Sequence, residues 1–185
     1  MSASGRRPTR NECGVDQLIT VHDYDPGWPN RFGEERRCLL GALGSIVVGI
    51  EHTGSTAVPG LEAKPIIDIS VSVSQLPLEE RHVAALQEIG YEYLAECGVP
   101  GRLYFRKREP HGFNVYVLQQ ESSLWDHNLL FRDYLQAHPD EARRYGSLKR
   151  KIARQAPHDL RLYTDRKGRF ICRTLERARE WRRSP

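Results

Sequence analysis

The sequence of 185 residues has no long apolar run and no internal repeat. A membrane-spanning helix needs about 18 or more consecutive apolar residues, and no stretch approaches that length. The opening residues MSASGRRPTRNECG contain no apolar signal-peptide segment. These absences predict a cytoplasmic protein with no membrane partner.

Cysteine is scarce, and the four cysteines form no C-x-x-C pair: Cys13, Cys38, Cys97 and Cys172. Their spacing indicates neither a zinc site nor a thiol redox motif. We expect all four to stay reduced. Cys38 and Cys172 fall in helical patterns, which favours small core residues over nucleophiles.

Length and charge are typical of a globular domain. The chain is long enough for one well-buried core, and we expect a flexible arm over residues 1–22 and a single domain over 23–185. The net charge is +4, with the basic residues concentrated between Arg143 and Arg183. Such a stretch could meet phosphates, nucleic acid or an acidic partner, or it could be a solvated helix surface.

The hydrophobic pattern predicts an α+β (mixed α/β) fold with a helical C-terminal part. Trp28, Phe32, Leu39 and Leu43 should form the inner face of the first helix, packed on a sheet, and Asp140 is suited to capping a later helix. In order, the expected elements are a helix from Pro26 to Gly44, a buried strand over 45–54, a second strand over 64–73, a helix over 77–90, a hairpin of strands over 101–109 and 112–120, and helices over 122–139, 140–155 and 159–181.

Residues 51–73 place a Gly-Ser turn shortly before an aspartate in an apolar strand. If Ser55 opens a tight turn, its hydroxyl and the free backbone N–H groups nearby suit a phosphate. Asp68 would present an oxygen ligand to magnesium beside it. The alternative is an ordinary turn and a satisfied buried acid. Lys64 has the same two interpretations, a phosphate contact or a solvated lysine at the strand entrance.

The two-residue period of a strand adds neighbours to Asp68. Asp68 and Ser70 share one side of their strand, and Asn114 and Tyr116 share one side of a later strand. If the two strands are adjacent, Asn114 and Tyr116 should lie near Asp68. His52 could act as an acid, a base or a ligand, with a structural role as the alternative.

Three segments together resemble the GrpB family, within the DNA polymerase beta-like nucleotidyltransferase superfamily: HTGSTAVPGLEAKPIIDI, LLFRDYLQAHPDEARRYGSLKRKIA and LYTDRKGRFI. The resemblance implies a nucleotidyltransferase-like sheet flanked by helices. It also implies that Gly54, Ser55 and Thr56 bind a nucleoside triphosphate, most simply ATP, while Asp68 holds magnesium. Lys149 and Lys167 lie in family-like helical motifs and could reach phosphates, although a surface position is the alternative for each.

Two positions depart from the pattern of site residues that the resemblance implies. Ser70 stands where the superfamily has a second carboxylate, and Tyr116 stands where a histidine is usual. One carboxylate makes a poor magnesium cage, which weakens the two-metal mechanism of the superfamily. We therefore expect free magnesium to bind weakly.

The resemblance implies a transferase that moves a nucleotidyl or phosphoryl group to a small acceptor. A ligase that adenylates a carboxylate and passes it to an amine is a variant of this function. Two alternatives stay open. One is a nucleotide-binding protein that has lost its second acid, and the other is a nucleic-acid or protein-interaction module that uses the basic C-terminal helices.

Overall fold

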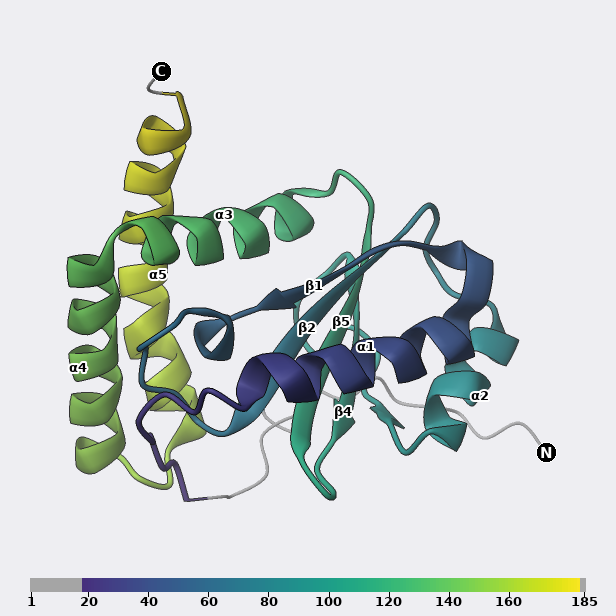
Figure 1. Cartoon of the computed structure of the whole chain (residues 1–185), viewed down its shortest axis with the longest axis horizontal. Coiled ribbons are helices and arrows are strands. Elements are labelled where there is room, and N and C mark those ends of the chain that lie inside the picture. Colours follow the sequence, from purple (N-terminus) through teal and green to yellow (C-terminus); the bar gives the residue numbers. More distant parts are fainter. Residues whose placement is uncertain (1–17, 184–185) are drawn as a thin grey trace.

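The computed structural model describes residues 18–183, which include a five-stranded sheet in the order β1-β2-β5-β4-β3 (Figure 1). The parallel pair β2 and β5 forms the centre, and the other neighbouring strands are antiparallel. The hairpin of β4 and β5 is as expected, and the mixed α+β class is confirmed. The strands are β1 (Val47–Thr53), β2 (Ile66–Val73), β3 (Glu92–Tyr93), β4 (Arg102–Lys107) and β5 (Gly112–Gln119).

One face of the sheet packs on α1 (Trp28–Leu43) and α2 (Glu80–Glu88). Alternate residues of the central strands, such as Ile69 and Val115, are fully buried against these helices. The predicted inner face of α1 is confirmed, because Trp28, Leu39 and Leu43 are buried and Phe32 is partly buried against the same core. The burial of this apolar surface is the main force that holds the sheet on its helices.

The other face of the sheet is polar, and the C-terminal helices lie on that side. They are α3 (Ser123–Ala137), α4 (Pro139–Gln155) and α5 (Leu160–Arg183). α3 contacts β1, β2 and β5, and it also packs on α4 and α5. A second apolar core joins α3, α4 and α5 to the loop after β1 through residues such as Leu61, Phe131 and Ala178. This arrangement leaves part of the polar face open between the sheet and α5.

Two details of the helices and strands differ from the sequence predictions. β1 is an edge strand rather than a buried one, since among the strands of residues 18–183 it pairs with β2 alone, and Val48 is 50% exposed. α4 begins at Pro139, with His138 at the N-cap, so Asp140 lies in the first turn and does not cap the helix. Asp140 instead forms an ion pair with Arg143.

The cysteines also differ from the prediction. Cys38 and Cys172 are exposed on their helices and are not core residues, because the helices turn other side chains inward at those positions. Cys97 is disulfide-bonded, which contradicts the expectation that all four cysteines stay reduced.

The expected N-terminal arm is described only in part, since residues 1–17 lie outside the described residues. The segment 18–22 packs against the C-terminal helices, and the Ile19 backbone N–H donates to the Pro157 carbonyl at 2.7 Å. Ile19 is buried in a small cluster with Ile152 and Tyr163, and His22 bridges to Ala63. This segment forms one wall of the cleft described next.

Candidate functional site

Asp68 lies at the centre of the polar face, where β2 and β5 run side by side. The parallel register pairs Asp68 with Asn114. The Asn114 Nδ2 atom donates to Asp68 Oδ1 at 2.8 Å, and the Tyr116 hydroxyl donates to the same oxygen at 3.3 Å. The predicted proximity of Asn114 and Tyr116 to Asp68 is therefore confirmed. Within residues 18–183, Asp68 forms no ion pair, so neutral donors alone hold its carboxylate.

The Gly54-Ser55 turn approaches the same carboxylate from β1. Thr53, the last residue of β1, pairs with Asp68, and the chain then turns through Gly54 at φ +70° into a short 3₁₀ turn. A Cβ atom on Gly54 would lie 2.3 Å from Asp68 Oδ2. Only glycine therefore allows this turn to pass so close to the acid.

Ser55, the next residue of the turn, interacts with Tyr145. Burial raises the pKa of the Tyr145 phenol, and the hydrogen bond with the Ser55 hydroxyl offsets part of that rise.

Three lysines surround this carboxylate, and each comes from a different segment. Lys64 precedes β2, Lys149 lies on α4 and Lys167 lies on α5. The Nζ atoms of Lys64 and Lys167 lie 5.9 Å and 5.2 Å from the centre of the Tyr163 ring. Lys149 Nζ donates to the Glu62 carbonyl and lies 4.6 Å from the centre of the Tyr145 ring.

Burial lowers the pKa of these lysines, and their mutual repulsion adds to the shift. The pKa of Lys64 falls to about 8 through burial and then the charge of Lys167, and that of Lys149 falls to about 7 for the same two reasons. Burial also lowers the pKa of Lys167. The surface interpretation of Lys149 is wrong, since only 2% of that residue is exposed. The charge of Asp68 acts in the opposite direction on all three lysines, so it offsets part of the repulsion between them.

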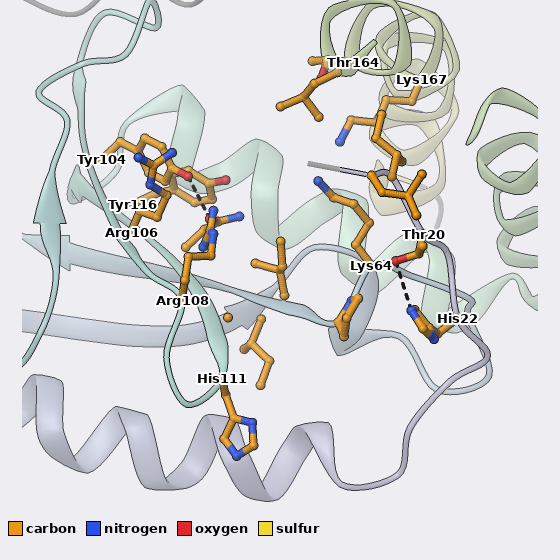
Figure 2. Close-up of a pocket in the computed structure, with 18 of the residues that line it drawn as sticks. Thr20, His22, Lys64, Tyr104, Arg106, Arg108, His111, Tyr116, Thr164 and Lys167 are labelled. Atoms are coloured by element: carbon orange, nitrogen blue, oxygen red, sulfur yellow. Dashed lines mark hydrogen bonds between the residues drawn. The ribbon is translucent and has the colours of Figure 1, made fainter. Parts of the chain in front are cut away.

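A cleft of about 1690 Å³ opens beside these groups, lined by Lys64, Lys167, Asn114 and Tyr116 among others. Figure 2 shows Lys64 and Lys167 pointing into the space from one side, while Arg108 and Tyr116 stand on the other. Asp68 is half-buried behind the two lining residues of β5 that donate to it. The cleft therefore joins a carboxylate to a strongly cationic wall.

Several of the residues predicted for the site do not line the cleft: Gly54, Ser55, Thr56, Lys149, Ser70 and His52. Ser70 is fully buried, and its hydroxyl bonds to Thr53 and Asn128 at 3.1 Å each. His52 lies on the opposite side of β1, stacked on Phe32 at 4.9 Å and bonded to the buried Thr56 at 2.9 Å. Burial, and then the charge of Arg132, lower the pKa of His52 to about 4, so this ring is neutral at pH 7.

The sequence prediction did not include several residues that line or adjoin the cleft. Arg102 and Tyr104 are two residues apart on β4, which pairs with the strand of Asn114. The two-residue period of a strand, applied to the predicted hairpin, could therefore have placed them on the same face as Asn114. Arg108 follows β4 directly. Tyr145 and Tyr163 carried no comparable signal, because their place depends on how α4 and α5 dock on the domain.

The donor set does not fit the two-metal arrangement that the resemblance implies. Asp68 is a single carboxylate, and within residues 18–183 no group of three or more His, Cys, Asp or Glu side chains could hold a metal ion. The position of the second acid is a buried serine, and the charged groups that interact with Asp68 include the ammonium groups of the three lysines. Two magnesium ions require several oxygen ligands and little positive charge nearby.

None of the helices within residues 18–183 is both long enough and apolar enough to cross a membrane.

The fold and the site define an α+β domain with a cationic cleft beside a single carboxylate. Residues 18–177 match the family described as GrpB protein, so the chain belongs to the GrpB family.

Relatives and a solved structure agree with this membership. The chain is 41% identical to a UPF0157 protein of Pseudomonas aeruginosa over 92% of this chain and 72% of that protein. It is 34% identical to the glutamate-rich protein GrpB of Alkalihalophilus pseudofirmus, over 85% of this chain and 94% of the relative. The crystal structure of the conserved protein GrpB from Enterococcus faecalis is 36% identical and superposes with a TM-score of 0.77, covering 88% of this chain and 99% of the other.

Proposed function

We propose that this protein is an enzyme that binds a nucleoside triphosphate, most simply ATP, and transfers a nucleotidyl or phosphoryl group to a small acceptor. One observation carries the proposal. Lys64 and Lys167 point into the cleft beside Asp68, and neither forms an ion pair within residues 18–183. Phosphate oxygens are the natural partners of such ammonium groups.

The electrostatics of the lysine cluster support a polyanionic ligand. Burial and mutual repulsion lower the pKa of Lys64 to about 8, so the protonated form is less stable than it would be in water. A bound triphosphate would replace the lost hydration with direct charge interactions. The apo protein would thus hold a preorganised binding site, and phosphate binding would relieve the repulsion within it.

The proposed transfer assigns a role to each side of the cleft. An acceptor oxygen attacks a phosphorus atom of the nucleotide and a new O–P bond forms. The bond that breaks releases pyrophosphate in nucleotidyl transfer and the nucleoside diphosphate in phosphoryl transfer. Lys64 and Lys167 stabilise the negative charge on the phosphoryl oxygens. Asp68, oriented by Asn114, accepts the proton of the acceptor hydroxyl. With a carboxylate acceptor, the same attack would give an acyl adenylate for ligation to an amine.

Magnesium has no assigned step in this scheme, because the residues present do not fit a two-ion cage. We propose that any magnesium in the site enters with the triphosphate, which supplies most of its oxygen ligands. Free magnesium should then bind weakly to the apo protein.

A titration with a non-hydrolysable ATP analogue tests the binding part of the proposal. The Lys167→Met variant should lose affinity by about tenfold or more, since one charged contact to phosphate is lost. Lys151→Met is the matched control, because Lys151 is exposed on α4 and does not line the cleft. Equal affinity of the wild type and Lys167→Met would overturn the proposal, as would a wild type that binds no nucleotide.

A second candidate is a nucleotide-binding protein without turnover. The burial of Ser70 at the position of the second acid favours it, and so does the Tyr116 hydroxyl bonded to Asp68. Release of pyrophosphate or ADP across a panel of small acceptors separates the two candidates. Nucleotide binding without any release would support the second.

The basic C-terminal helices give less support to nucleic-acid binding. Some of their arginines are paired with acids, as when Arg144 and Arg177 each lie 2.7 Å from a carboxylate oxygen of Glu141. These pairs reduce the charge offered to a nucleic-acid backbone. Salt-sensitive binding of RNA by the intact chain would reopen this alternative.

A further inference from the structure

The wall of the cleft opposite the lysines is built from arginine and tyrosine. Arg102 and Tyr104 come from β4, Arg108 follows that strand, and Tyr116 comes from β5. In Figure 2, Arg108, Tyr104 and Tyr116 stand across the cavity from Lys64. The proposed function places the phosphates at the lysines and leaves this second cationic wall without a role.

Arg102 is held in place by aromatic rings rather than by an acid. Its guanidinium carbon lies 4.9 Å from the centre of the Tyr116 ring and 5.4 Å from that of Tyr104, and the two rings stack at 5.3 Å. Its Nε atom donates to the Glu96 carbonyl at 3.3 Å. Within residues 18–183, Arg102 forms no ion pair with a carboxylate.

Arg108 is fixed by backbone carbonyls. Its Nη1 atom donates to the carbonyls of Lys107 and Phe113 at 3.0 Å and 3.1 Å, and its Nη2 atom donates to Asn114 Oδ1 at 3.1 Å. No ion pair with a carboxylate forms here either, in the part of the chain that the structure describes. The neighbouring Arg106, in contrast, pairs with Glu92 at 2.5 Å.

Asn114 connects this wall to the carboxylate of the site. Its Oδ1 atom accepts from the Tyr104 hydroxyl at 2.8 Å and from Arg108, while its Nδ2 atom donates to Asp68. These contacts fix the orientation of the amide, with oxygen toward the arginine and nitrogen toward the acid. A group bound at Arg108 would therefore lie one amide away from Asp68, and Arg102 lies beside it through the stacked rings of Tyr104 and Tyr116.

We propose that Arg102 and Arg108 form an acceptor subsite that binds a carboxylate, so that the acceptor of the proposed transfer is a small molecule with a carboxylate group. Guanidinium groups that are held rigid and lack an acid partner are suited to such a planar anion. The subsite would orient the acceptor so that its reacting atom lies at Asp68, between the two cationic walls. This inference rests on the proposed function for the identity of the reaction.

Binding of three probes tests the subsite: glutarate for a carboxylate, glycerol 3-phosphate for a phosphate, and the non-hydrolysable ATP analogue for the nucleotide. Each is titrated into the wild type, Arg102→Gln and Arg108→Gln. Arg161→Gln is the control, because it removes one positive charge from an exposed side chain at the rim of the same cleft.

Glutarate should bind the wild type and lose about tenfold or more in affinity in Arg102→Gln and Arg108→Gln, since each variant removes a charged hydrogen-bond donor. The affinity for the ATP analogue should change by less than about threefold in the same variants, which is within the usual effect of a charge that makes no contact. Arg161→Gln should change neither affinity by more than that. Circular dichroism checks that each variant is folded.

Three results would overturn the subsite. If the arginine variants weaken the ATP analogue as much as glutarate, the wall belongs to the nucleotide. If glycerol 3-phosphate binds about tenfold more tightly than glutarate, the anionic group is a phosphate. If glutarate fails to bind while the ATP analogue binds, the subsite is wrong and the proposed nucleotide site stands. Binding of glutarate without binding of the ATP analogue would instead overturn the proposed function and support a carboxylate site.

Discussion

Glu35 and Asp68 are both shielded from solvent, but they have opposite relations to the cations near them. Glu35, on α1, is 6% exposed and accepts from the Lys107 ammonium at 2.8 Å and from the Tyr91 hydroxyl at 2.9 Å. Asp68 accepts only from neutral donors, although three lysines surround it. The structural acid is thus paired with its cation, whereas two of the lysines near Asp68, Lys64 and Lys167, line the cleft without an ion pair in the described part of the chain.

The same difference separates the two faces of the sheet. The face toward α1 and α2 is apolar, and Glu35 and Lys107 neutralise one another at its edge. The face toward α5 carries several positive charges around one cleft, and among the described residues Lys64, Lys167, Arg102 and Arg108 form no ion pair with an acid. Unpaired charge of one sign costs stability, and this cost is the reason for proposing that the cleft binds an anion.

The largest effect on stability is expected at the Gly54 turn. Gly54→Ala should destabilise the protein by up to about 6 kcal/mol, of which about 1–3 kcal/mol is backbone strain at φ +70° and a similar amount is the collision with Asp68. Urea unfolding measures this loss. Gly60→Ala is the control, since Gly60 also has positive φ but has open space around its Cα atom. If both variants lose the same stability, the close approach to Asp68 has no importance.

Removing the structural acid should come next in effect. Glu35→Ala leaves the Lys107 ammonium and the Tyr91 hydroxyl without their partner, which should cost about 3–5 kcal/mol in the free energy of unfolding. The folded variant should still bind the ATP analogue, because Glu35 is not among the residues of the cleft. Glu34→Ala, at the exposed neighbouring position, should change the stability little.

The lysine cluster should make stability depend on pH. The pKa of Lys149 is about 7 in the folded protein, against an ordinary 10.5, so between these values the unfolded chain binds more protons. The free energy of unfolding should therefore rise as the pH rises from 7 to 10. Lys149→Met should lose about 1–3 kcal/mol of this rise, and exposed Lys151→Met should keep it. Parallel curves for the wild type and Lys149→Met would show that Lys149 stays charged when folded.

The smallest stability effect is expected at Asp68. Asp68→Asn retains the size of the side chain and should change the free energy of unfolding by about 1 kcal/mol. Group transfer, measured as release of pyrophosphate or ADP in the presence of an acceptor, should fall by about 100-fold or more because the proton acceptor is lost. A loss of stability like that of Glu35→Ala, with turnover intact, would make Asp68 a second structural acid.

Sequence reasoning could place Asp68, Asn114 and Tyr116 together because a strand has a strict two-residue period. The same period puts Ser70 on the polar face, but its burial depends on Asn128 of α3, which no local pattern relates to β2. The side of α4 that carries Lys149 is likewise set by docking between distant helices.

His52 illustrates the limit at shorter range. It precedes the Gly-Ser turn by one residue and looks well placed in the sequence. Because alternate residues of a strand face opposite sides, Thr53 points toward the polar face and His52 packs on Phe32 of α1. The side of the sheet that holds the site could be assigned only once β1 was paired with β2.

Proton uptake on nucleotide binding is the most direct test of the central claim, that the lysine wall of the cleft binds a triphosphate. Calorimetric titrations of the ATP analogue at pH 8 in two buffers of different ionisation enthalpy measure it. The pKa of Lys64 is about 8 in the apo protein, and bound phosphate should raise it, so the wild type should take up protons. Lys64→Met should take up fewer and bind more weakly. Binding heats that are independent of the buffer, with equal affinity in Lys64→Met, would contradict the account.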